Sequence, residues 1–452
     1  MSPPCRISHC SLLAILVLVP RLGIAGTKSV VVLASAPTSD STADDSLRPT
    51  SAPPWNPPHP LSSARTWETI LRFPGHLITL PIRGLGRLAE RWTYSIENGS
   101  LIPRIRSQFS GGTDTSFSVS PADLGDRSGL GIRVRAHPSS LGHHVHADLS
   151  ESFYQYSRVN VGVSRGPADL SYEHEWRPRE RFFGVGVDAP DTSSSYAFER
   201  DQIRLSLGHS WIRRDEHVPG SRIEAWAGPE VGLLLRGHEA PSFDEQFPAL
   251  AALEGGRREH FVYGLRAFRD TRSGRPHWRR GWRASFEAAR FDQPIRSLAI
   301  RNGRAEEPSF TRLTFQGETG VSFRRDPRTL RLAIKLIDQQ VSGDPRRLLV
   351  SELSTLGGLA GLSGFSPGRF HDLDLAVARL SYVFPLSKTF ELDLHAESGS
   401  VVPTLRALRR SALEHSYGVA FRPRRLSRPL FSIGLDGSRE GARMTIMLTG
   451  VE

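Results

Sequence analysis

The stretch that decides the fold covers residues 356–397 and reads LGGLAGLSGFSPGRFHDLDLAVARLSYVFPLSKTFELDLHAE. Its second half alternates apolar and polar side chains with a period of two, which is typical of extended strands and not of helices. Before the turn at residues 385–388, one face carries Ala376, Ala378, Leu380, Tyr382 and Phe384; after it, the same face carries Phe390, Leu392, Leu394 and Ala396. This strand pair predicts a wall with one apolar and one polar face.

The same alternation recurs along residues 106–452. Clear examples are Ile132 and Val134 against Arg133 and Arg135, Ile203, Leu205 and Leu207 against Arg204 and Ser206, and Leu330, Leu332, Ile334 and Leu336 against Arg331 and Lys335. About 345 residues in sixteen strands gives roughly 22 per strand and connection, which suits spans of about 9 to 11 residues joined by turns and loops. The sequence therefore predicts an all-β fold, a transmembrane antiparallel β-barrel of about 16 strands, with fourteen as the alternative.

Tryptophans near the ends of the expected strands could mark the two membrane interfaces. We expect such girdles to include Trp176, Trp211, Trp226, Trp278 and Trp282. The alternative is that these tryptophans form the core of a soluble β protein.

Composition excludes several other classes. Only 38% of the residues are hydrophobic, and no apolar run approaches the roughly 20 residues that a membrane-crossing helix needs, which excludes a helical membrane protein. The net charge of +11 comes from arginine, because the lysines are Lys28, Lys335 and Lys388 alone. The arginines alternate with apolar residues or lie in expected loops, without a nucleic-acid-binding module, so we expect no nucleic-acid partner.

The N-terminal quarter divides into three segments before the barrel at residues 106–452. Residues 1–25 have the basic start, short apolar block and small residues of a cleaved signal peptide, and they contain both cysteines, Cys5 and Cys10. An uncleaved membrane anchor is the alternative. Residues 26–63 are predicted to be a disordered Pro-rich linker. Residues 64–105 are predicted to be an amphipathic helical segment with a basic face, which suits a membrane surface or the barrel mouth; a helix packed on a globular core is the alternative.

Residues 362–370 and the strand that follows them have a more specific signature. The residues are Leu362, Ser363, Gly364, Phe365, Gly368, Arg369 and Phe370, followed in the next strand by Tyr382, Phe384 and Pro385. They resemble the loop and strand motifs of the bacterial surface-antigen (Omp85) superfamily of outer-membrane barrels, which includes the BamA- and TamA-like proteins. Ser363 stands in place of the superfamily's signature arginine, and Ser381 and Val383 replace the glutamate and arginine of the strand motif.

Two further segments resemble the same superfamily. Gly184 and Gly186 belong to an aromatic-Gly-x-Gly turn, and Asp270, Thr271, Arg272, Pro276 and Gly281 follow the end of one strand into the start of the next. Residues 27–106 lack the β-α-α-β-β pattern of periplasmic POTRA domains, so the resemblance implies a short form. Residues 449–452, TGVE, depart from the superfamily's aromatic C-terminus.

In the superfamily, the loop arginine reaches an acidic side chain on the barrel wall. Here both halves of that pair are replaced, by Ser363 and Ser381. We predict that the loop still folds inward and is held by Arg369, because a buried charge needs a partner. The candidate partners are Asp372, Asp374, Glu391, Asp393 and Glu397.

No catalytic, cofactor-binding or metal site is expected. Residues 364–368 have the G-x-S-x-G spelling of a nucleophile elbow, but Pro367 and the strand that follows leave no helix to support Ser366. His144, His146 and Asp148 share one face of an expected strand, where solvated polar residues are the simpler interpretation of a possible metal site.

The resemblance implies a non-enzymatic role in outer-membrane protein or lipid assembly in the bacterial outer membrane. Expected partners are membrane lipid, lipopolysaccharide and other outer-membrane or periplasmic proteins. The alternatives are a passive or gated diffusion pore with an anion-favouring lumen and, less favoured, an outer-membrane hydrolase. The first and last strands, near residues 112–119 and 443–448, are expected to form the seam.

Overall fold

The computed structural model describes most of the chain from residue 117 to residue 448. The described residues are 117–124, 127–136, 139–140, 143–212, 219–239, 241–247, 257–272, 280–293, 308–323, 328–387, 390–423 and 431–448. The predicted signal peptide, linker and helical segment, together with Trp278, Pro276 and the C-terminal residues 449–452, lie outside them. None of the helices in the described part of the chain has the length and apolar character needed to cross a bilayer.

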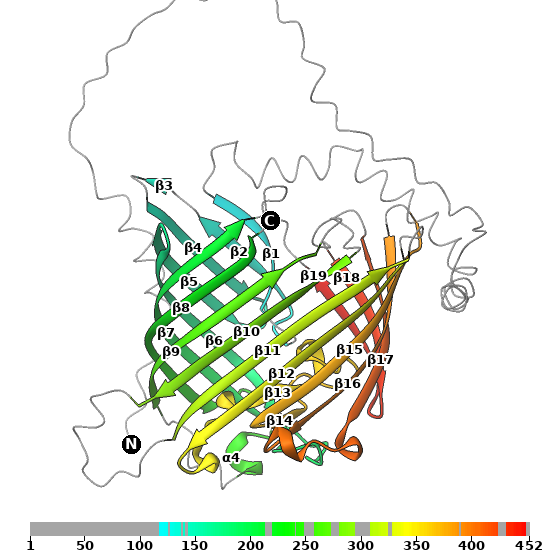
Figure 1. Cartoon of the computed structure of the whole chain (residues 1–452). Coiled ribbons are helices and arrows are strands. Elements are labelled where there is room, and N and C mark those ends of the chain that lie inside the picture. The colour runs from blue at the N-terminus through cyan, green and yellow to red at the C-terminus, as the bar shows by residue number, and fades with distance from the viewer. Residues whose placement is uncertain are drawn as a thin grey trace, which may run out of the picture. The chain divides into compact units, whose positions relative to one another are not determined.

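The strands with alternating side chains pair into one large antiparallel sheet that curls into a barrel (Figure 1). Its first ten strands are β1 (Phe117–Asp123), β2 (Leu130–Ala136), β3 (Ser139–Ser140), β4 (His143–Ser152), β5 (Ser157–Arg165), β6 (Ala168–Phe182), β7 (Ser194–Ile212), β8 (Pro219–Arg236), β9 (Arg257–Asp270) and β10 (Arg280–Asp292). The remaining strands of the wall are β11 (Ser309–Ser322), β12 (Thr329–Ser342), β15 (Asp374–Pro385), β16 (Phe390–Val402), β17 (Glu414–Pro423), β18 (Phe431–Ser438) and β19 (Gly441–Leu448).

The described sheet holds 17 strands, and β3 has only 2 residues, so sixteen longer strands make the wall, as predicted. Successive wall strands pair antiparallel from β1 with β2 through β18 with β19, and β12 pairs directly with β15. The barrel brings β1 next to β19, as expected for the seam (Figure 1). The strand pairings found among the described residues do not include one between these two strands.

Between β12 and β15 the chain leaves the wall and enters the barrel at the lower end in Figure 1. This segment, residues 343–373, is called the plug below. It contains the short helices η3 (Pro345–Arg347), η4 (Val350–Glu352) and η5 (Gly358–Ala360), and a separate two-stranded sheet of β13 (Ser354–Leu356) and β14 (Phe370–Asp372). Other short helices are α4 (Phe243–Gln246), η6 (Leu405–Ala407) and η7 (Arg410–Ala412).

The two faces of the wall separate as the alternation predicts. On β7 the apolar side chains of Ile203, Leu205 and Leu207 are about half exposed on the outside, where a bilayer would cover them. Arg204 between them points inward and donates to Gln202. Trp226 departs from the predicted girdle, because it is 6% exposed on the inward face, between the guanidinium groups of Arg204 and Arg266.

Candidate functional site

The plug begins with a polar anchor on the wall opposite the seam. His260 of β9 contacts Glu352 through Nε2 and Oε1 at 2.7 Å, and the second carboxylate oxygen of Glu352 accepts from the Leu349 amide at 2.6 Å. Arg258 donates to the Arg347 carbonyl at 2.7 Å, and Arg312 of β11 donates to the Glu352 carbonyl. The first half of the plug is therefore fixed to β9 and β11.

The second polar anchor gathers around Ser363 and attaches the plug to β16 and β18. The Ser363 hydroxyl lies 2.9 Å from Glu397 Oε2, 2.9 Å from Asp436 Oδ1 and 3.3 Å from His395 Nε2. The Ser363 amide donates to the same Glu397 oxygen at 2.5 Å, and His395 Nε2 lies 2.7 Å from Asp436 Oδ1. Ser416 of β17 also donates to Glu397, at 2.8 Å. We call Ser363, His395, Glu397 and Asp436 the serine anchor.

A glycine makes the serine anchor possible. His395 on β16 and Asp436 on β18 meet across the strand that separates them, β17, directly over Gly418, which is the register partner of both. A Cβ atom at Gly418 would lie 2.1 Å from Asp436 Oδ1 and 2.8 Å from His395 Nε2. Any side chain at this position would therefore separate the imidazole from the carboxylate.

Ser363 thus faces two carboxylates, those of Glu397 and Asp436, although it carries no charge itself. Arg379 of β15 supplies positive charge instead, donating to Glu397 Oε1 at 3.0 Å and to the Ser381 hydroxyl at 3.2 Å. Beside these groups lies a cavity of about 270 Å³, whose lining includes Asp393, Arg331 and Arg422. The lumen here combines both charge signs.

Arg369 is buried in the plug, and its partners differ from the predicted ones. It is 1% exposed, and it donates to Asp191 Oδ1 at 2.7 Å, to the Ala189 carbonyl at 2.9 Å and to Glu440. Its guanidinium also lies over the rings of Phe183 and Phe370, 5.0 Å from each centroid. The five acidic residues named from the sequence have other partners. Asp393 and Glu397 pair with Arg379, and Glu391 pairs with Arg422. Asp374 and Asp372 accept hydrogen bonds from backbone amides. Arg369 reaches connecting loops and not the strands that carry these residues.

Apolar packing completes the plug. Leu362, Phe365 and Phe370 are fully buried and form one cluster with Leu356, Ile337, Leu375, Val377 and Val401. Leu362 has a φ of 62°, a conformation that a branched side chain adopts only when its surroundings hold it there. The carbonyls of Gly364 and Phe365 accept from Ser438 and Arg443, at 2.8 Å and 2.7 Å. The predicted motif residues therefore lie together.

The turn with Gly184 and Gly186 meets the plug from the other side. Val185, between the two glycines, forms a parallel bridge with His371, and the Gly186 amide donates to the His371 carbonyl at 2.8 Å. The His371 ring packs edge-on against Phe182 at 5.1 Å. Burial lowers the pKa of His371 to about 3, so the imidazole is neutral.

The third motif lies away from the plug and shapes a turn. Arg272 pairs with Asp270 at 2.6 Å, and the Thr271 amide donates to the Trp282 carbonyl at 2.8 Å. Gly281 has a φ of 110°, and a Cβ atom there would lie 2.5 Å from the Thr271 carbonyl oxygen. These residues fix the connection between β9 and β10. Tyr382, Phe384 and Pro385 end β15 at the same end of the barrel.

The sequence candidates for chemistry remain separate. Ser366 lies between η5 and β14, so the described chain does not give it the helix of a nucleophile elbow. Asp148 pairs with Arg133 and Arg135, and His146 Nδ1 lies 3.8 Å from Asp169.

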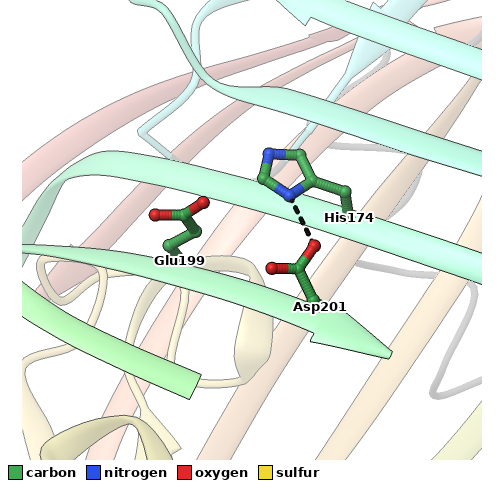
Figure 2. Close-up of side chains that lie close together, drawn as sticks. All are labelled: His174, Glu199 and Asp201. Carbon is green, nitrogen blue, oxygen red and sulfur yellow. Dashed lines mark hydrogen bonds and ion pairs between the residues drawn. The ribbon is translucent and has the colours of Figure 1, made fainter. Parts of the chain in front are cut away.

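Another group, which the sequence analysis did not identify, brings together His174, Glu199 and Asp201, with ligand atoms within 4.8 Å of one another (Figure 2). They lie on β6 and β7, the partner strands, where His174 and Asp201 are paired in the register. Asp201 accepts from His174 at 2.9 Å and from the Tyr172 hydroxyl at 2.6 Å. The group faces outward with Tyr172 and Ile203, and the hydrogen bonds within it join His174 and Tyr172 to Asp201.

These observations define a class: a transmembrane antiparallel β-barrel whose lumen is entered by a plug that is anchored to the wall on two sides. No family model matches the chain, and no curated protein matches it. Among solved structures, BamA from Haemophilus ducreyi lacking POTRA domains 1-3 is similar, with 12% identity and a TM-score of 0.50 over 73% of this chain and 69% of that chain.

Two Pseudomonas aeruginosa structures also match. OccK2 (OpdF) has 11% identity and a TM-score of 0.27 over 74% of this chain and 91% of that chain. OccK10 (OpdN) has 10% identity and a TM-score of 0.29 over 74% of this chain and 96% of that chain. The likeness to BamA supports the fold of an outer-membrane β-barrel.

Proposed function

We propose that this chain is a bacterial outer-membrane barrel that takes part in the assembly of outer-membrane proteins or lipids. The observation that carries the proposal is the anchored plug. Glu352 attaches it to β9, the serine anchor attaches it to β16 and β18, and Arg369 attaches it to two loops. The loop motif from Leu362 to Phe370 lies in this plug, and the turn with Gly184 and Gly186 lies against it. A plug anchored in this way favours a function that the barrel wall performs. It disfavours the function of an open diffusion channel.

The proposal includes the location and partners of the chain. Residues 1–25 direct export and are removed, and the long connections at the plug end face the cell exterior, because spanning barrels place short turns on the periplasmic side. Membrane lipid and lipopolysaccharide surround the wall, and unfolded outer-membrane or periplasmic proteins are the clients. No catalytic step is part of this function.

Reconstitution tests the assembly role. Purified protein in phosphatidylethanolamine and phosphatidylglycerol liposomes is mixed with a urea-unfolded eight-stranded barrel protein, and folding is followed by the shift in gel mobility. We expect faster folding than in empty liposomes. Equal rates for empty liposomes and for liposomes containing this protein would contradict the assembly role.

A diffusion pore is the second candidate, and the inward arginines favour it. Arg204, Arg266 and Arg312 point into the lumen, where they would attract anions. Single-channel conductance in a planar bilayer separates the two functions: a pore conducts steadily with the plug in place, whereas an assembly barrel conducts only after the plug is released. Fatty-acid release from the same liposomes would indicate the hydrolase alternative.

A further inference from the structure

The lipid-facing wall carries a hollow over β12 and β15–β19. Its volume is about 590 Å³, and most of its lining side chains are apolar: Leu330, Leu380, Tyr382, Leu394, Val419 and Leu435. All of these side chains belong to the outward face of the wall, as their register shows. Leu330 pairs with Tyr382, Tyr382 with Leu394, Leu394 with Val419, and Val419 with Leu435.

The hollow results from small residues in the adjacent row of the same face. That row crosses the strands from Leu380 through Ala396, Tyr417 and Gly437 to Ala442. Large side chains at Leu380 and Tyr417 stand on either side of Ala396, and beyond Tyr417 two small residues follow in succession. Tyr417 is 64% exposed, so it rises from the wall as one side of the hollow.

The dimensions suit a single hydrocarbon chain. The row from Leu380 to Ala442 crosses five neighbouring strands, β15 to β19, so at about 4.8 Å spacing it extends for roughly 19 Å across the sheet. One leaflet contributes about half of the roughly 30 Å hydrocarbon core. The row is therefore long enough to hold one lipid chain along much of its length.

The floor of the hollow is the backbone beneath the serine anchor. His395, Gly418 and Asp436 also line it, but their polar groups are directed to the plug side, where His395 and Asp436 bond to each other and to Ser363. A bound water needs two to four polar partners, and the apolar side chains of this hollow do not supply them. Hydrocarbon is the matching occupant.

We propose that this hollow is a binding site for one acyl chain of a membrane lipid, retained on the wall directly behind the serine anchor. The site is continuous with the lipid-facing surface of the barrel. It depends on the barrel fold and not on the assembly role, so it stands or fails independently of that role.

The test is binding of palmitoyl-oleoyl phosphatidylethanolamine to the purified full chain in detergent micelles, measured by native mass spectrometry. Ala396→Phe and Ala442→Phe fill the hollow. Ala225→Phe is the matched control, because Ala225 is an exposed alanine on the outward face of β8, paired with Leu207 and Leu265. Gel mobility checks that each variant is folded.

We expect the filled variants to bind the lipid about tenfold more weakly, since losing contact with two methylene groups is enough for that change, and the control to bind it like the wild type. Tyr417→Ala removes one side of the hollow without filling it and should weaken binding as well, which keeps the test valid if a filled variant fails to fold. Equal affinity of the wild type and all three hollow variants would overturn the proposal. So would a dimer that Ala396→Phe dissociates, because a second copy would then cover the hollow.

Discussion

Replacing Gly418 by alanine tests whether the serine anchor holds the plug. The added methyl group would lie 2.1 Å from Asp436 Oδ1, 2.8 Å from His395 Nε2 and 2.9 Å from the Leu435 carbonyl oxygen. Asp436 is 3% exposed and His395 7% exposed, so the added methyl group fits only if one of these side chains shifts toward the cavity of about 270 Å³ that both of them line. We expect the variant to lose the His395–Asp436 contact of 2.7 Å and the Ser363–Asp436 contact of 2.9 Å.

Hydrogen bonds to charged groups contribute about 1.5 to 3 kcal/mol each. Because the carboxylate keeps part of its hydrogen bonding after it shifts, we expect a loss of about 2 to 4 kcal/mol for Gly418→Ala, and a fall of several degrees in the unfolding midpoint. The assay is thermal unfolding in detergent, combined with proteolysis of the plug at residues 343–373. We expect the plug to be cleaved faster than in the wild type.

The matched control is Gly232→Ala, an inward glycine of β8 whose added methyl group would meet nothing closer than Phe198 at 3.5 Å. It should leave the midpoint and the cleavage rate almost unchanged. If Gly418→Ala behaves like this control, the contact across β17 does not hold the plug, and the reasoning is refuted.

Three further predictions concern other parts of the site. Arg369→Met should release the plug, raise single-channel conductance and lower the free energy of unfolding by about 2 kcal/mol. Asp191→Asn should change little, because the Asp191 side chain is 89% exposed. Unchanged conductance and proteolysis in Arg369→Met would disprove the role of Arg369. The His371 imidazole has a pKa of about 3 in the folded protein and an ordinary pKa near 6.5 when unfolded. Its contribution to stability is therefore constant above pH 6.5 and falls by about 1.4 kcal/mol per pH unit between pH 6.5 and about pH 3. Burial raises the pKa of the neighbouring Asp372, so the contribution of Asp372 to stability has the opposite dependence on pH. Comparing the acid unfolding of the wild type with that of His371→Leu therefore isolates the effect of the imidazole. Identical acid unfolding of the two proteins would contradict the prediction. Gly281→Ala should destabilise the β9–β10 connection by about 1 to 3 kcal/mol, measured in urea, because its φ is 110° and the Thr271 carbonyl blocks the methyl group; an equal urea midpoint would show that the turn relaxes.

The sequence by itself determined the wall. Alternation with a period of two is a local property, because neighbouring side chains on a strand point to opposite faces wherever the strand lies. The run from Ile203 to Leu207 therefore predicted which side chains face outward, and the length of the chain set about sixteen strands. The motif spacing also located the plug residues from Leu362 to Phe370, although it did not show what they touch.

Only the tertiary structure decided the contacts of the plug. Arg369 reaches Asp191 across 178 residues of sequence, and Ser363 reaches Asp436 across 73. Strand order and register determine which side chains meet at such separations, and a one-residue change of register would turn each side chain to the other face. From the alternation alone, Trp226 could not be distinguished from the other tryptophans, and Asp436 could be identified only as a polar residue. Trp226 lies between two lumen arginines, and Asp436 lies across Gly418 from His395. Both positions follow from how neighbouring strands align, because a contact forms only where the closed sheet brings its two partners to the same place.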